Sequence, residues 1–139
     1  MSLPESAGEE RLLGIGIDME DVERIDALLQ RYGERFLGRV FTEREVAYCR
    51  RRRFPAQHLA GRFSVKEAAM KALGTGRSRG VLWRDVEVVR RHGPPQLELR
   101  GGARRHFDRL GASRALVSIT HTPRLAMAQV VLLGTDRRP

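Results

Sequence analysis

The order of apolar and small positions near the start of the chain has the period of a β-strand. Residues 12–18 place large apolar side chains on one side, and two glycines followed by a carboxylate on the other. From Glu20 the apolar positions change to helical spacing, and Gly33 follows as a stop signal. A strand that continues into a helix is therefore predicted. The two strand sides are Leu13, Ile15 and Ile17, and Gly14, Gly16 and Asp18.

Two further helices follow. Thr42 and Glu45 have the spacing of a capping box, so a helix begins there, and it must end before Pro55. The next helix runs from about residue 56 to 73, with an apolar stripe along one face and Gly74 as its cap.

The second half of the chain has mainly strand patterns. Segments 86–89 and 96–99 flank a Gly-Pro-Pro turn and predict a hairpin. A short helix from about residue 103 to 110 precedes strands at 115–121 and 125–133. The resulting order, β-α-α-α-β-β-α-β-β, predicts one α+β domain over residues 11–134. We expect residues 1–10 to form a disordered leader and residues 135–139 a tail.

Composition narrows the class of protein. A chain of 139 residues with 41% hydrophobic and 31% charged residues is the size and balance of one globular domain. The single Cys49 excludes an intrachain disulfide, and the four histidines lack zinc-ligand spacing. The longest apolar stretch, 125–133, is too short to span a bilayer, and no signal peptide pattern is present. We expect a soluble cytoplasmic protein with no membrane association.

The charge predicts an anionic partner. The first ten residues hold three acids and no base, so the rest of the chain carries 26 basic against 14 acidic side chains, or +12. Arginine accounts for 24 of the 26 basic residues, which we attribute mainly to codon bias. The only lysines, Lys66 and Lys71, lie close together, and codon bias does not explain that concentration.

Asp18 is the first candidate site residue. It ends a strand whose neighbouring positions on the same side are glycines, so a bulky anionic ligand can approach the backbone there. The alternative is that Asp18 caps the following helix, with Glu20 and Asp21 complementing the helix dipole. From these residues alone, the capping interpretation is favoured.

The segment around the two lysines is more informative. Glu67 and Lys71 stand one helical turn apart, which also suits a simple surface ion pair. Lys66 falls within the apolar stripe, however, and a charged group at the border of a core is costly to bury. Such a group is therefore expected to have a structural or functional role. Just beyond, the loop Gly74-Thr75-Gly76 with two following arginines offers amides and cations for a phosphate. An ordinary glycine cap explains this loop equally well.

Two other features have simpler interpretations. His121 ends a strand on the same side as Val117 and Ile119, so a packed, hydrogen-bonded histidine is expected. The arginine run at 50–53 is most simply a solvated helix end. Nucleic-acid contact is a distant second, because the aromatic content is 6% and no binding motif is present.

Five motifs follow one another along the chain. They are Gly14-Ile15-Gly16-Ile17-Asp18 with Glu23-Arg24-Ile25, Phe41-Thr42-Glu43-Arg44-Glu45, Ala60-Gly61-Arg62-Phe63-Ser64-Val65-Lys66-Glu67-Ala68, Lys71-Ala72-Leu73-Gly74-Thr75-Gly76, and Val117-Ser118-Ile119-Thr120-His121-Thr122. Together these motifs resemble the holo-acyl-carrier-protein synthases, the small single-domain group of phosphopantetheinyl transferases. The resemblance is collinear from about residue 12 to 133. Ser64 and Val65 stand where alanines are usual, and Thr120 where serine is frequent.

The resemblance implies a fold, a reaction and an assembly. The fold would be a small, mainly antiparallel sheet packed against a long helix. The reaction would transfer the phosphopantetheine group of coenzyme A to a serine of apo-acyl carrier protein, in fatty acid biosynthesis, and release adenosine bisphosphate. Members of the family are commonly homotrimers with each site at a subunit boundary.

The resemblance also assigns roles to residues. Asp18 and Glu67 would bind Mg²⁺, Lys71 and His121 would contact coenzyme A phosphates, and the loop Gly74, Thr75, Gly76 would lie beside the nucleotide. These roles agree with general chemistry, because Mg²⁺ takes one or two carboxylates together with substrate phosphates, and phosphoryl transfer needs charge neutralisation of the kind that Lys71 provides.

Other roles are less constrained by the sequence. Either Glu67 or a metal-bound water is the base that removes the proton of the attacking serine. Arg24 and Arg31, on an exposed helix face, would bind the acidic carrier. The competing hypothesis is a non-catalytic, basic nucleic-acid-binding module, which explains the arginines but not the acid at the strand end or the Lys-Glu-Lys cluster.

Overall fold

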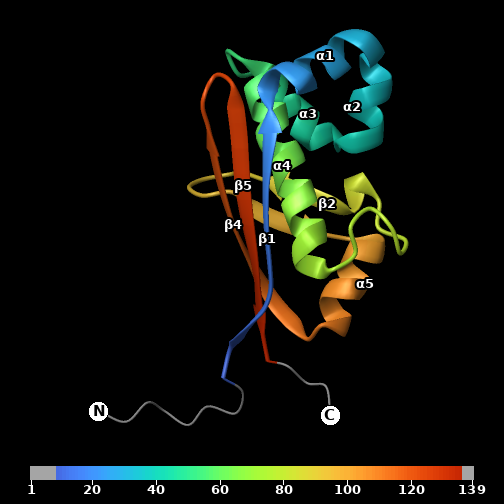
Figure 1. Cartoon of the computed structure of the whole chain (residues 1–139), viewed down its shortest axis with the longest axis vertical. Coiled ribbons are helices and arrows are strands. Elements are labelled where there is room, and N and C mark those ends of the chain that lie inside the picture. The colour runs from blue at the N-terminus through green and yellow to red at the C-terminus, as the bar shows by residue number, and fades with distance from the viewer. Residues whose placement is uncertain (1–8, 136–139) are drawn as a thin grey trace.

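A three-stranded antiparallel sheet and one long helix organise the molecule (Figure 1). The computed structural model describes residues 9–135, so the predictions for residues 1–8 and 136–139 lie outside the described residues. The sheet has the order β1-β5-β4, with β1 at Arg11–Asp21, β4 at Ala112–His121 and β5 at Leu125–Gly134. Helix α4, Pro55–Leu73, packs along one face of the sheet. The predicted α+β fold is confirmed.

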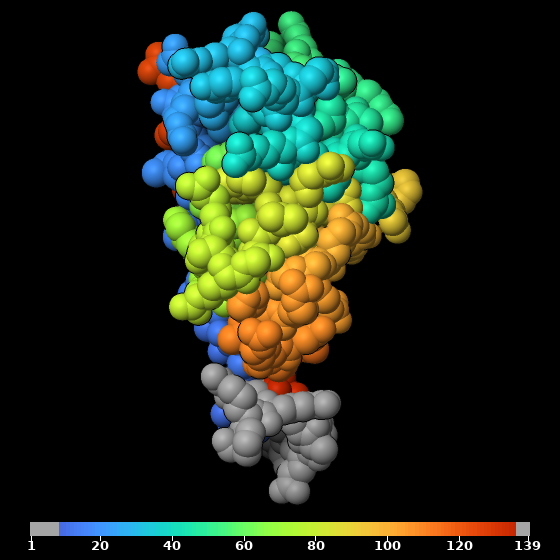
Figure 2. All heavy atoms as spheres, turned by 90° about the vertical axis from the view of Figure 1, so that its right-hand side faces the viewer, coloured from blue at the N-terminus to red at the C-terminus, as the bar shows by residue number. Residues whose placement is uncertain are grey.

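The remaining elements surround α4 on that same side. Helices α1 (Val22–Tyr32), α2 (Glu34–Val40) and α3 (Glu43–Arg50) gather at one end (Figure 1). A short 3-10 turn, η1 (Trp83–Asp85), leads into the hairpin of β2 (Val86–Val89) and β3 (Gln96–Leu99), and α5 (Gly101–Arg109) follows. Seen from the helix side in Figure 2, α1–α3, the segment of residues 74–85 and α5 succeed one another along the surface.

The structure differs from the sequence predictions where β1 meets the helices. Strand β1 continues to Asp21, whose side chain caps α1 by accepting a hydrogen bond from the Glu23 amide at 2.9 Å. The expectation that Asp18 caps this helix is therefore wrong. Gly33, at φ 52°, joins α1 to α2 instead of ending the helical region, so α2 is an additional helix. The predicted capping box of Thr42 with Glu45 is confirmed at the start of α3.

Two glycines let β1 and α4 meet backbone to backbone. A Cβ atom on Gly14 would lie 2.2 Å from the Ala72 carbonyl oxygen, and one on Gly16 would lie 1.8 Å from the Ala68 carbonyl oxygen. No side chain fits in this space. The side of β1 that carries the glycines is therefore the face that packs on α4. Asp18 follows on that face, beside the middle of the helix.

Lys66 fixes the rotation of α4 about its axis. Its side chain is fully buried, and its Nζ donates to Glu45 Oε1 at 2.8 Å, to the Trp83 carbonyl at 3.1 Å and to the Val86 carbonyl. These acceptors come from α3, η1 and β2. Because Lys66 points away from β1, its neighbour Glu67 lies on another side of the helix.

The sheet face opposite α4 is largely apolar, and no element within residues 9–135 covers it (Figure 1). Helices cover only one side of the sheet (Figure 1), and the other side presents large hydrophobic side chains that are between 37% and 58% exposed. These side chains are Ile15, Ile17 and Met19 of β1, Leu116 of β4 and Met127 of β5.

Within residues 9–135 no helix is long and apolar enough to cross a membrane.

Candidate functional site

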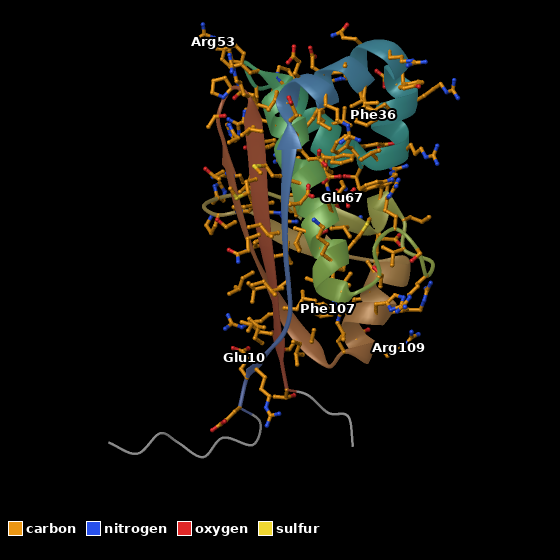
Figure 3. The ribbon with its side chains drawn as sticks, viewed as in Figure 1. Glu10, Phe36, Arg53, Glu67, Phe107 and Arg109 are labelled. Atoms are coloured by element: carbon orange, nitrogen blue, oxygen red, sulfur yellow. The ribbon has the colours of Figure 1, made fainter. Side chains whose placement is uncertain are left out.

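The structure brings Asp18, Glu67 and Lys71 together at the β1 edge of the sheet. Lys71 Nζ donates to the Ile17 carbonyl at 2.9 Å and to Asp18 Oδ1 at 3.3 Å. Glu67, labelled in Figure 3, lies one turn earlier on α4. The spacing of Glu67 and Lys71 alone also suits an ion pair between them, but within residues 9–135 the ion pair of Lys71 is with Asp18.

Negative charge in this cluster is only partly neutralised. Asp18 Oδ2 is buried and has no hydrogen-bond partner. Burial and repulsion from Asp18 raise the pKa of Glu67. The same two causes raise the pKa of Glu20, a further carboxylate on this face of β1, to about 7, although Arg24 opposes the shift. The mutual repulsion of Asp18 and Glu67 favours a bound cation, whereas Glu20 has a counter-ion in Arg24.

The loop after α4 supplies fewer free amides than expected. Gly74 adopts the left-handed conformation of a helix cap, with φ 78°. Its amide donates to the Lys71 carbonyl at 3.1 Å, and the Thr75 and Gly76 amides donate to the Met70 carbonyl at 3.0 and 3.3 Å. The expectation of free amides at these residues is therefore wrong. A role for Gly74, Thr75 and Gly76 beside a nucleotide stays a prediction.

His121 lies at the other edge of the sheet and is more open than expected. It ends β4 on the α4 side, but it is exposed, so the expectation of a packed histidine is wrong. Its ring meets the His58 ring edge-on, with centroids 5.2 Å apart. Burial and the nearby positive groups, led by His121, lower the pKa of His58 to about 4. His58 is therefore neutral near pH 7.

A pocket rich in arginine, called the cationic pocket below, lies near His58, whose ring centroid is 6.1 Å from that of Tyr48 in the pocket wall. Sequence reasoning did not assign this pocket. Arg62 is only 4% exposed, its guanidinium stacks 4.0 Å from the Tyr48 ring centroid, and its Nε has no hydrogen-bond partner. The one available signal was an arginine inside an otherwise apolar helix segment. The pocket has a volume of about 290 Å³ and is lined by Arg44, Ala47, Tyr48, Arg51, Arg62, Val88, Val89, Arg90 and Arg91.

Asp18, Glu67 and Lys71, called the acidic cluster below, and His121 lie on opposite edges of the sheet. Asp18 pairs with Ala128 of β5, whose other neighbour is Ile119 of β4, so the whole width of the sheet separates β1 from β4. Helix α4 lies over the middle, with Lys71 directed to β1 and His58 to β4. One chain therefore does not bring His121 together with Asp18, Glu67 and Lys71.

Arg24 and Arg31 both lie on the exposed side of α1, as expected. Arg24 forms an ion pair with Glu20 at 3.1 Å, and Arg31 stacks 5.2 Å from the Tyr32 ring centroid. A groove of about 600 Å³ between α1 and α2 is lined by Leu28, Tyr32, Arg35, Phe36 and Arg39. A larger groove of about 1060 Å³, between α1 and the start of α4, contains none of the predicted site residues.

Comparison with known proteins agrees with this architecture. Residues 14–127 match the model of the 4'-phosphopantetheinyl transferase superfamily. The holo-[acyl-carrier-protein] synthase of Solibacter usitatus is 44% identical over 87% of this chain and 98% of its own length, and that of Methylorubrum populi is 48% identical over 87% and 93%.

Solved structures show the same similarity. The holo-[acyl-carrier-protein] synthase of Neisseria meningitidis superposes with a TM-score of 0.80 at 30% identity, over 88% of this chain and 98% of that one. The enzyme from Bacillus anthracis, in complex with coenzyme A (3',5'-ADP), gives 0.73 at 32% identity, over 89% and 98%. These matches span the sheet, α4 and the elements around it. The chain therefore belongs to the 4'-phosphopantetheinyl transferase superfamily, as an enzyme of its holo-[acyl-carrier-protein] synthase group.

Proposed function

We propose that this enzyme transfers the phosphopantetheine group of coenzyme A to a serine of apo-acyl carrier protein, in a Mg²⁺-dependent reaction that serves fatty acid biosynthesis in the cytoplasm. The relatives named above are synthases of holo-acyl carrier protein, and one was solved with coenzyme A. The single observation that carries the proposal is the meeting of Asp18, Glu67 and Lys71 at the β1 edge.

The acidic cluster suits Mg²⁺. Asp18 Oδ2 is buried without a partner, and Asp18 and Glu67 repel one another. No group of three metal-binding side chains is arranged around a common point within residues 9–135, and Mg²⁺ needs only one or two carboxylates because it keeps waters and takes phosphate oxygens. Asp18 and Glu67 would hold the ion. When bound, the ion neutralises charge on the pyrophosphate.

Glu67 and Lys71 have different tasks in the proposed transfer. The serine Oγ forms a bond to the phosphorus that bears the pantetheine arm, and the bond from that phosphorus to the bridging oxygen breaks, so adenosine bisphosphate leaves. Glu67 accepts the serine proton, a role that its raised pKa favours. Lys71, held at the Ile17 carbonyl and Asp18, places a compact positive charge beside the leaving phosphate.

The cationic pocket suits the phosphates at the adenosine end of coenzyme A. Arg62 is buried with an unsatisfied Nε–H, and a buried charged donor without an acceptor is costly. An anionic oxygen would remove that cost through charge-assisted hydrogen bonds. Arg51, Arg90 and Arg91 line the same pocket. We assign His121, beside His58, to the same group of phosphates.

A complete site therefore needs two chains. The acidic cluster lies at the β1 edge of the sheet and His121 at the β4 edge, and a contact between two different edges closes into a ring when the rotation permits. The uncovered apolar face, which includes Ile17 and Met127, gives such an assembly a surface to bury. We propose a homotrimer, the ring that the family resemblance implies, with each site at the boundary of two chains.

The carrier protein is proposed to dock on α1. Arg24 lies beside the acidic cluster, and Arg31 lies two turns further along the exposed side of the helix. The neighbouring groove adds Arg35 and Arg39 around the apolar side chains of Leu28 and Phe36. Basic side chains around an apolar groove suit an acidic partner with an apolar helix face.

Mass spectrometry of the carrier tests the reaction. The purified enzyme, incubated with coenzyme A, Mg²⁺ and apo-acyl carrier protein, should add the mass of one phosphopantetheine group to the carrier. Glu67→Gln should keep the circular dichroism spectrum and lose this activity at saturating Mg²⁺, whereas Glu43→Gln, an exposed acid at the start of α3, should retain it. A wild-type enzyme that adds no mass would refute the proposed function.

A complementation experiment tests the shared site. Glu67→Gln disables the acidic cluster and His121→Ala weakens the cationic side, so each variant alone should be slow at limiting coenzyme A. Chains of the two variants, unfolded and refolded together, should regain activity, because some boundaries then combine an intact Glu67 from one chain with an intact His121 from another. Mixtures no faster than the separate variants would show that one chain holds the whole site.

A further inference from the structure

Glu20 and Arg24 form an ion pair that links the acidic cluster to the proposed docking helix. Glu20 is near the end of β1, and Arg24 is in the first turn of α1. Arg24 Nη1 lies 3.1 Å from Glu20 Oε2, with the Glu20 side chain only 10% exposed and the Arg24 side chain 62% exposed. The anchored end of the pair is therefore inside the protein, and the cationic end is at the surface.

The local fold fixes the carboxylate of this pair. Glu20 has the same strand parity as Asp18, so both side chains point to the α4 side of the sheet. The backbone turns from strand to helix immediately afterwards, where the Val22 amide donates to the Arg124 carbonyl at 2.8 Å and Asp21 caps the helix. Glu20 consequently has little freedom to move toward solvent.

The pair also determines where the Arg24 guanidinium lies. An exposed arginine side chain normally samples many rotamers, and a fixed carboxylate selects among them. Arg24 lies close enough to the acidic cluster to oppose the rise in the pKa of both Glu20 and Glu67. The hydrogen bond to Glu20 uses only Nη1, so the remaining N–H groups of the guanidinium can bind an anionic group on a docked partner.

We propose that Glu20 is a positioning residue, which holds the Arg24 guanidinium at the rim of the acidic cluster so that an acidic group of the carrier docks with its serine beside Glu67. The inference rests on the proposed function, because it uses docking at α1. It predicts that removing the Glu20 charge weakens use of the carrier protein, while use of coenzyme A and of Mg²⁺ stays the same.

The test compares four variants by steady-state kinetics at saturating Mg²⁺. Glu20→Gln should raise KM for apo-carrier about fivefold, and Arg24→Gln about tenfold, with KM for coenzyme A unchanged. The double variant should match Arg24→Gln alone, because Glu20 acts through Arg24. Glu23→Gln removes an exposed carboxylate of the same helical turn and should leave both KM values unchanged.

One further variant and two further measurements separate positioning from other roles of the charge. Glu20→Asp keeps the charge but shortens the side chain by one carbon, so it should also raise KM for the carrier. If Glu20→Gln folds poorly, Glu20→Asp tests the positioning role in its place. Direct binding of fluorescent apo-carrier, without coenzyme A, should weaken in the same order. Titration with Mg²⁺ should give the wild-type midpoint for every Glu20 variant.

The outcomes distinguish this inference from the proposed function. If Arg24→Gln raises KM for the carrier and Glu20→Gln does not, the positioning role is wrong and docking at α1 stands. If the Glu20 variants raise only the Mg²⁺ requirement, Glu20 serves the cation and the inference is overturned. If Arg24→Gln also leaves KM for the carrier unchanged, docking at α1 fails and the positioning role fails with it.

Discussion

Replacement of Gly16 by alanine tests how the contact between β1 and α4 positions the acidic cluster. The added Cβ would lie 1.8 Å from the Ala68 carbonyl oxygen, and within 2.9 Å of the Ala68 carbonyl carbon and the Ala72 amide nitrogen. All three are backbone atoms of α4, so no side chain can rotate away. An ordinary contact of 3.4 Å requires the strand and the helix to separate by roughly 1.6 Å.

This separation has an energetic and a catalytic cost. Forced overpacking of a core costs about 1–3 kcal/mol or more, and we expect about 3 kcal/mol here because the rigid backbone must move. Asp18, two residues further on the same face of β1, would move relative to Glu67 and Lys71. Misplacement of reacting groups by about 1 Å can cost about 100-fold in rate, so we expect kcat to fall by about that factor.

Urea unfolding followed by circular dichroism measures the stability, and the rate of mass gain on the carrier measures kcat. Gly38→Ala is the matched control: Gly38 lies inside α2 with no atom within 4 Å of an added Cβ. It should gain about 0.5–1 kcal/mol from its better helix propensity and keep wild-type kcat. A Gly16→Ala enzyme with wild-type stability and turnover would refute the reasoning.

Three other predictions follow from the lysines, the open sheet face and Glu20. Lys71→Arg should keep the fold and lower kcat at least about tenfold. Lys66→Arg, at a fully buried site with three acceptors, should instead lower the free energy of unfolding by about 1–3 kcal/mol in urea titrations. Equal effects of the two variants on kcat and on stability would contradict this difference. Ile17→Lys should dissociate the assembly in sedimentation velocity runs and lower activity, and an intact trimer would show that the open face is not an interface. The pKa of Glu20 is raised from 4.5 to about 7 in the folded protein. The protonated Glu20 carboxyl therefore contributes most to stability below its unfolded pKa, and this contribution is lost as the pH rises through about 7. In EDTA, Tm should fall between about pH 5 and about pH 8 by more in the wild type than in Glu20→Gln.

Local rules account for the elements that the sequence predicted well. The capping box at Thr42, the cap at Gly74 and the hairpin around Gly93 each depend on residues within a few positions of one another. Helix α2 was missed because Gly33 also has the properties of a terminal cap, and its role as a joint depends on the packing of Phe36 and Leu37 in the core.

The site depends on contacts between distant segments, which the residue pattern does not contain. Asp18, Glu67 and Lys71 were predicted through the family resemblance, and the spacing of Glu67 and Lys71 alone suggested a different ion pair. The place of Glu20 beside Asp18 and Arg24 was missed because an acid before a helix is commonly a dipole partner. Arg62 was missed because its unsatisfied Nε is visible only once β2 and α3 surround it.

The pairing of β1 with β5 has a consequence for the timing of enzyme synthesis. Asp18 pairs with Ala128, which lies 110 positions later in the chain, and the described part of the sheet gives β1 no other strand as a partner. On the ribosome, β1 therefore waits while helices α1–α4 and the β2–β3 hairpin emerge, and pairings between such distant segments form slowly because a long loop must close first. We therefore expect the acidic cluster to form only after residues 125–134 have left the exit tunnel, so a nascent chain that already carries Asp18, Glu67 and Lys71 should still be inactive.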